Sequence, residues 1–304
     1  MKGMASVASG LRGRRSPEGE NDSPAGSRGI PLAAVAWFAL LLIAGSFSIL
    51  KRLALQWAND GDMGHGFFVP LVAAYIAWQR RERLLQLRLT PSWWGAAVML
   101  WGAIQGYLGM LGADLFLQRT SILITLYGLL LLVGGATLLR ALAFPLLLLP
   151  FMIPFPGVVY NEITFPLQLF ASRVAEVALG LLGVPVYRDG NVLEIPSQRL
   201  DVAEACSGIR SLLSLSFLSL VYAYLFDQRV WMRWMLLAAT LPIAIIANAG
   251  RITLTGLLSE VNPELAHGVF HTMEGWVIFA VAAVMLAGLH LFIMWLTRKR
   301  RSPA

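Results

Sequence analysis

The 304-residue chain contains one cysteine, Cys206, in the segment ACSGIR. A single cysteine cannot form an internal disulfide, so it is either a small packing residue or a reactive thiol. Cys206 stands where a polar, strand-like stretch gives way to a long apolar run. A thiol at the start of a helix is favoured as the thiolate by the helix dipole and by a nearby cation such as Arg210. Since the thiolate attacks carbonyl carbon, Cys206 is a candidate nucleophile.

Two further segments carry side chains that would complete this chemistry. Arg251 ends the segment NAGR, and His267 and His271 lie in HGVFH shortly before the last apolar run. An arginine stays protonated, so it can hold a carboxylate or stabilise an oxyanion. A histidine can accept the thiol proton and return it to a leaving amine. Cysteine, arginine and histidine at one membrane depth therefore suggest acyl transfer through a thioester.

Each residue also has a purely structural interpretation. Cys206 could pack, Arg251 could extend to the membrane interface, and His271 could be an interfacial histidine. Arg210 lies one turn inside an apolar run and therefore needs an anionic partner such as Glu204 or a ligand. His267 and His271 have the i, i+4 spacing of metal ligands, but the HExxH arrangement is absent, so we expect no metal and no other cofactor. We interpret His65 as an outer-loop residue and His290 as a packed residue.

The composition indicates an integral membrane protein. Hydrophobic residues make up 57% of the chain and charged residues 13%, about half the charged share of soluble domains. The net charge of +7 comes from basic residues in short loops and at the C-terminus, where they set topology. We therefore expect no nucleic-acid partner.

Residues 1–29 are polar and are predicted to form a disordered cytoplasmic tail, and residues 30–304 a single membrane domain. The fold expected is an all-α polytopic membrane protein with about eight transmembrane helices. Basic clusters then fall on one side, which places both termini in the cytoplasm. The candidate spans are Pro31–Leu50, Gly66–Trp78, Trp94–Leu111, Ser121–Leu139, Ala141–Phe155, Ser207–Phe226, Met232–Ala249 and Trp276–Leu296.

Residues 158–183 have helical apolar spacing that is interrupted by charged side chains. This pattern favours an amphipathic helix on the outer face over a ninth span, an alternative that stays open. Asp189-Gly190, between two β-prone runs, predicts a small β-hairpin, and residues 200–204 could add a third extended piece leading to Cys206.

The chain resembles the exosortase/archaeosortase family of integral membrane cysteine peptidases over about residues 30–300. The resemblance is carried by three blocks in order: VAEACSGIR from Val202, ANAGRI from Ala247 and FHTMEGWVIF from Phe270. It implies a catalytic triad of Cys206, Arg251 and His271. The residues that would support the triad within these blocks are Glu204, Ser207, Gly208, Arg210 and Asn248.

The resemblance implies a bacterial inner-membrane enzyme that acts at the outer face. Its substrates would be exported proteins whose C-terminal tail carries a Pro-Glu-Pro-like motif, a hydrophobic span and a basic cluster. Cleavage near the motif would join the new C-terminus to an acceptor that the sequence does not identify. A different class of function also fits: a transporter or assembly factor for exopolysaccharide, in which Arg210 and Arg251 bind an anionic ligand.

Overall fold

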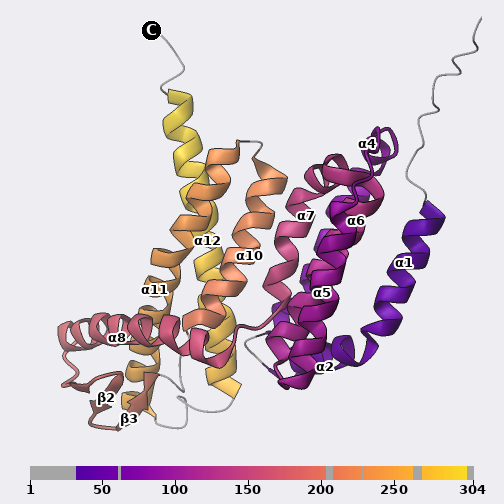
Figure 1. The fold of residues 1–304 in the computed structure, drawn as a ribbon. Helices are drawn as coiled ribbons and strands as arrows, with labels where there is room; N and C mark the ends of the chain where they lie inside the picture. The colour runs from indigo at the N-terminus through magenta and orange to yellow at the C-terminus, as the bar shows by residue number, and fades with distance from the viewer. Residues whose placement is uncertain (1–31, 61–62, 203–207, 228, 263–268, 300–304) are drawn as a thin grey trace, which may run out of the picture.

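The computed structural model describes residues 32–60, 63–202, 208–227, 229–262 and 269–299, and these are mostly helical (Figure 1). The first group of helices is α1 (Leu32–Gly45), α2 (Phe47–Asn59), η1 (Gly64–Phe67), α3 (Phe68–Gln79), α4 (Arg81–Leu85), α5 (Trp94–Leu111), α6 (Leu115–Ala141), α7 (Ala143–Leu148) and η2 (Leu149–Met152). The second group is α8 (Gly157–Leu181), α10 (Gly208–Phe226), α11 (Val230–Val261) and α12 (Val269–Lys299). Between α8 and α10 lie the strands β1 (Tyr187–Asp189), β2 (Val192–Ile195) and β3 (Gln198–Asp201).

Three apolar clusters hold these elements together. One cluster joins the first group to α10, with Val69, Leu148 and Leu220 among its buried members. A second packs α10, α11 and α12 against one another. The third packs α8 against the sheet and the far half of α11, through residues such as Leu179 and Ile252.

The length and hydropathy of the described helices support a multi-pass membrane protein. Three helical segments are long and apolar enough to span: Leu115–Ala141, Val230–Val261 and Gly275–Thr297. The count rises to five if each of two bent helix pairs is one span. Three to five spans are therefore supported among the described residues, and the predicted number of eight is not shown.

The predicted span Pro31–Leu50 is not one helix. The chain bends by 73° between the α1 and α2 segments, at Ser46, which is buried. The predicted span Ala141–Phe155 is likewise a short helix, α7, followed by the single turn η2. After it the chain turns by 88° into α8.

Helix α8 covers the segment for which the sequence left two alternatives, an interfacial helix or a ninth span. In Figure 1 it runs across the start of α10 and across the far half of α11 rather than alongside them. This orientation is the one expected of a helix that lies on a membrane surface.

The strands form one antiparallel sheet in the order β1-β2-β3. Asp189 pairs with Val192, so the turn between β1 and β2 is Gly190-Asn191, and Gly190 has the positive φ of +62° that such a turn requires. The predicted hairpin is confirmed, and the third extended piece, predicted at residues 200–204, is the strand Gln198–Asp201. Arg188 Nε lies 2.6 Å from Glu176 Oε2 of α8, and Ser197 N donates to Glu260 Oε1 of α11 at 3.0 Å. These two contacts fix the sheet on α8 and α11.

Helix α6 bends near its end at Gly135, where φ is +66° and ψ is −166°. The chain before α5 passes against this bend, and Thr90 N donates to Gly134 O at 3.4 Å. A Cβ at Gly135 would lie 1.8 Å from Thr90 O, so only glycine fits. The last turn of α6, with Thr137 and Arg140, takes its direction from this bend.

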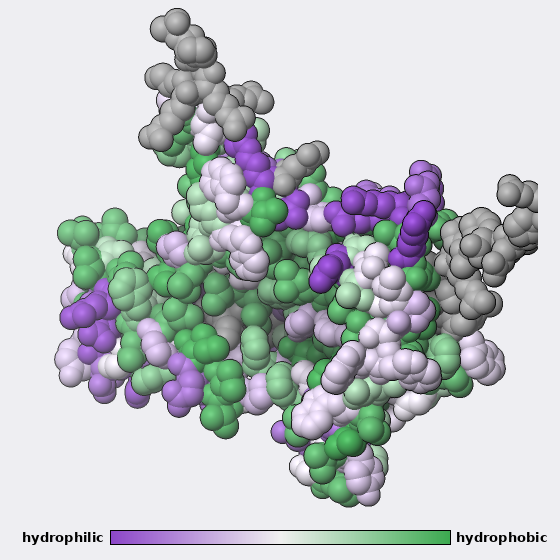
Figure 2. Space-filling model, turned by 45° about the horizontal axis from the view of Figure 1, so that its top comes forward, coloured by the Kyte–Doolittle hydropathy of each residue, from purple (hydrophilic) through white to green (hydrophobic). Residues whose placement is uncertain are grey.

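The basic segments meet at one end of the bundle, here called the basic end. Arg80, after α3, and Arg233, near the start of α11, both lie over the ring of Tyr224, with Cζ 5.1 Å and 4.9 Å from its centroid. Arg229 Nη1 donates to Thr297 Oγ1 of α12 at 3.4 Å. Figure 2, turned so that this end comes forward, shows hydrophilic residues grouped there and apolar residues over much of the remaining surface. The positive-inside rule expects such a one-sided distribution.

Candidate active site

The middle block of the three sequence motifs lies on α11, far from the basic end. Helix α11 packs against α8, α10 and α12 at once. Arg251 is half-buried on this helix, and its backbone carbonyl accepts a hydrogen bond from Thr255 Oγ1 at 3.0 Å. The helix that carries Arg251 is thus held by α10 and α12, which carry parts of the other two blocks, and by α8.

The guanidinium of Arg251 lies beside Gly275 of α12. A Cβ placed on Gly275 would be 3.6 Å from Nη2 and 3.7 Å from Cζ of Arg251. In the structure the guanidinium occupies that side of the glycine, so Gly275 lets Arg251 approach the third block.

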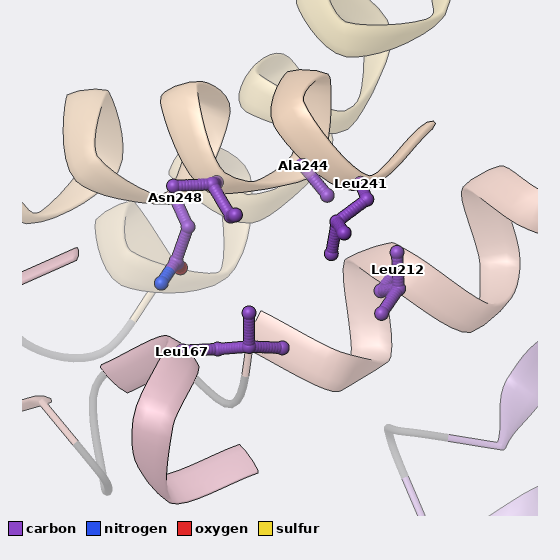
Figure 3. Close-up of a pocket in the computed structure, with 6 residues that line it drawn as sticks. Leu167, Leu212, Leu241, Ala244 and Asn248 are labelled. Carbon is purple, nitrogen blue, oxygen red and sulfur yellow. The ribbon is translucent and has the colours of Figure 1, made fainter. Parts of the chain in front are cut away.

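Asn248 precedes Arg251 by three residues and is buried. Its side chain borders a small cavity of about 10 Å³ where α8, α10 and α11 meet, a space that would hold about one water molecule (Figure 3). The neighbouring lining residues Leu167 and Leu212 are apolar. Asn248 is therefore the polar residue among those that line this cavity, and its amide can both donate and accept hydrogen bonds.

The first block approaches the same region through the start of α10. Leu212, one turn after Gly208, packs in one cluster with Ala247 of α11 and Ile278 of α12. On the other side of the block, Val202 is fully buried and its N donates to Asn191 O at 3.1 Å. The chain on both sides of the first block is therefore anchored next to the middle block.

Several predicted residues lie outside the described part of the chain. These are Glu204, Cys206, Ser207 and His267. Gly208 and Arg210 begin α10, and His271 lies in α12 one turn before Gly275. The backbone of α12 thus brings His271 within one turn of the residue that Arg251 contacts.

His65 is a residue whose position the sequence interpretation missed. One ring nitrogen, Nε2, lies 3.2 Å from Phe151 O, and Nδ1 lies 3.1 Å from Ser214 Oγ of α10. His65 therefore ties η1 to η2 and to α10 less than two turns from the start of that helix. The only sequence signal was a histidine flanked by glycines, and both of its partners are more than 80 residues away in the chain.

No cluster of three His, Cys, Asp or Glu side chains suited to a metal occurs within the described ranges. This finding does not cover the i, i+4 histidine pair of the third block, because His267 and the side chain of His271 lie outside the described ranges.

The match to a known family covers the whole region just described. A family model for the transmembrane exosortases matches residues 57–288, which include η1, the sheet and all three sequence blocks. No curated protein and no solved structure matches the chain. Because the family model covers more than half of the sequence, the chain belongs to the transmembrane exosortase family.

Proposed function

We propose that this protein is a membrane cysteine peptidase or transpeptidase that cleaves the C-terminal sorting tail of exported proteins. The observation that carries the proposal is the contact between Arg251 and Gly275, next to the anchored start of α10. The helix of Arg251 packs against α10, which follows the lone cysteine in sequence, and against α12, which carries His271, and these residue types suit thioester chemistry.

In the first half of the reaction, His271 accepts the thiol proton of Cys206. The sulfur attacks the scissile carbonyl carbon, and a C–S bond forms while the carbonyl oxygen becomes negative. The guanidinium of Arg251 donates hydrogen bonds to this oxyanion. When the C–N bond breaks, the imidazolium of His271 returns the proton to the leaving amine, and the new C-terminus remains on Cys206 as a thioester.

In the second half, an acceptor amine or water attacks the thioester carbonyl. His271 takes the proton of the attacking group, and the C–S bond breaks as the thiol of Cys206 is restored. Asn248 lies one turn from Arg251 in α11, and its buried amide would help to position this part of the helix. Hydrolysis and transfer differ only in this attacking group.

We place the reaction at the outer face of the bacterial inner membrane. The basic end would face the cytoplasm under the positive-inside rule, and Arg251 lies at the opposite part of α11. A substrate with a hydrophobic tail and a basic C-terminus would present its scissile bond at this depth when the tail spans the bilayer.

Replacement of Cys206 tests the proposal most directly. In cells that express a tailed substrate, we expect Cys206→Ser and Cys206→Ala to accumulate full-length precursor. The C-terminus of the mature substrate, read by mass spectrometry, should end near the motif in the wild type. Normal processing by Cys206→Ser would overturn the enzyme proposal in favour of an arginine-based transporter, since only a thioester enzyme requires the sulfur.

A further inference from the structure

The basic end contains a cavity of about 280 Å³ that plays no part in the proposed reaction. It lies between α4 and the last turn of α6, whereas Arg251 lies in the far half of α11. The volume is near the lower end of the roughly 300–1,000 Å³ typical of small-molecule pockets. A cavity of this size could hold part of a small molecule.

The lining of this cavity is strongly cationic. Arg80, between α3 and α4, and Arg83 of α4 line one side, and Arg140 lines the cavity from the end of α6. Thr137 adds a hydroxyl, and among the described residues that line the cavity there is no carboxylate. Three guanidinium groups around one space repel each other, and an anion bound between them would reverse that cost.

Two contacts hold the side chain of Arg80 in position. Arg80 Nη1 donates to Ala141 O at 3.4 Å, and its Cζ lies 5.1 Å from the ring of Tyr224. The nearest acidic residue in sequence, Glu82, is directed elsewhere: its carboxylate lies 4.0 Å from Arg81, and its side chain is 85% exposed. Glu82 therefore pairs with a neighbouring arginine that does not line the cavity.

The remaining walls are apolar and point to a lipid rather than to a free ion. Leu84 and Leu87 line the same cavity as the three arginines. Trp78, at the end of α3, and Trp94, at the start of α5, are 58% and 76% exposed, as expected of aromatic residues at a membrane–water boundary. A cationic pocket with apolar walls at this boundary matches the phosphate and the adjoining glycerol of a phospholipid. Basic pockets between helices at the cytoplasmic side bind anionic head groups in this way.

We propose that this cavity binds the phosphate head group of an anionic phospholipid in the leaflet that the basic end faces. Bound there, the lipid bridges α4 and the end of α6, next to the bond from Arg80 Nη1 to Ala141 O. The site rests on the geometry of the basic end and does not depend on the peptidase proposal.

Binding to the purified full-length protein tests this proposal. The protein would be reconstituted in nanodiscs of phosphatidylcholine with a small fraction of fluorescent phosphatidylglycerol, and bound lipid would be measured by energy transfer from tryptophan. The test variants are Arg83→Gln and Arg140→Gln, alone and together. Arg81→Gln is the matched control, since it removes the same charge from a side chain that stacks on Trp78 at 4.5 Å outside the cavity.

We expect each single test variant to weaken phosphatidylglycerol binding about fivefold and the double variant about thirtyfold, whereas the control changes it less than twofold. Equal losses in the control and the test variants would overturn the proposal, since they would show a general charge effect. Unchanged binding by the double variant would overturn it as well. Inorganic phosphate at millimolar concentration should not displace the lipid, and displacement would show a phosphate site instead. Should the double variant fail to insert, Thr137→Phe fills the cavity without removing charge and should give the same loss.

Discussion

Arg251 of α11 reaches across to α12 and rests beside Gly275, with Nη2 3.6 Å from where a side chain at that position would begin. This distance is an ordinary van der Waals contact, so a methyl group would just fit and a branched side chain would not. The glycine therefore determines how closely the guanidinium can approach the helix that carries His271.

A graded series at position 275 tests this relationship. We expect Gly275→Ala to process substrate nearly normally, because its Cβ makes only an ordinary contact with Arg251. Gly275→Leu should displace the guanidinium and accumulate precursor, while the protein stays inserted at normal abundance. Gly288 on the same helix has open space around it, so Gly288→Leu is the control and should process normally. Normal processing by Gly275→Leu would show that the contact is unimportant.

The shape of the Arg251 side chain should matter as much as its charge. A lysine offers a point charge in place of a planar fork of donors, so we expect Arg251→Lys to insert and fold but to lose processing by on the order of a hundredfold. The rate of precursor conversion in membranes measures this loss. Arg233→Lys, on the same helix at the basic end, should retain the wild-type rate. A wild-type rate for Arg251→Lys would reduce that residue to an interfacial anchor.

The two histidines of the third block should behave differently. His271 is one turn from Gly275 in α12, so we expect His271→Ala to slow processing by about a hundredfold or more, as loss of a general base does. His267→Ala should process nearly normally. The reverse outcome would make His267 the base. Equal failure of both variants would favour the interpretation of the two histidines as metal ligands. The effect of a chelator on processing by the wild type would then test that interpretation.

His65 should contribute to stability through its two contacts. His65→Ala leaves the carbonyl of Phe151 and the hydroxyl of Ser214 without these partners, which costs about 1–3 kcal/mol. We expect a lower midpoint of thermal unfolding in detergent, and a smaller decrease for Ser214→Ala. Additive effects in the double variant would show that the pair does not interact.

The turn of the sheet reports the orientation of the protein. In a Cys206→Ala background, Asn191→Cys should react with a membrane-impermeant maleimide once the outer barrier of intact cells is opened. Glu82→Cys, exposed at the basic end, should react only after the inner membrane is lysed. The opposite pattern would invert the proposed topology.

The helices that were predicted most accurately are those whose apolar runs end at polar residues. The predicted helix Trp94–Leu111 is found with the same bounds, and Ser207–Phe226 differs from α10 by one residue. Helix α11 continues well beyond its predicted end at Ala249, because polar residues end the apolar run without ending the helix. Thr253 Oγ1 and Ser259 Oγ donate to carbonyls of their own helix at 2.8 Å, which satisfies the hydroxyls internally.

Features that depend on distant partners could not be predicted in this way. The bend at Ser46 lies in a mainly apolar run, where the Gly45-Ser46 pair is a local signal for a kink that the prediction of a single span did not use. His290 was expected to be packed, and it is buried, but its contacts with Asp227 Oδ2 at 3.3 Å and Tyr222 Oη at 2.9 Å join residues more than 60 positions apart. For the candidate site, the sequence identified the three blocks, and the structure adds the contact from Arg251 to Gly275.

The length of α11, which has 32 residues, also sets a distance across the membrane. At about 1.5 Å per residue the helix is about 48 Å long, and Arg251 lies about 31 Å from Val230 at its start. A bilayer has a hydrocarbon core of about 30 Å, so a helix that enters at the basic end delivers Arg251 to the opposite boundary of that core. Under the proposed orientation the last turns of α11 would stand above the lipid, with the sheet attached to them through Glu260. The length of one helix would thus fix the height above the membrane at which any tail anchored in it can be cut.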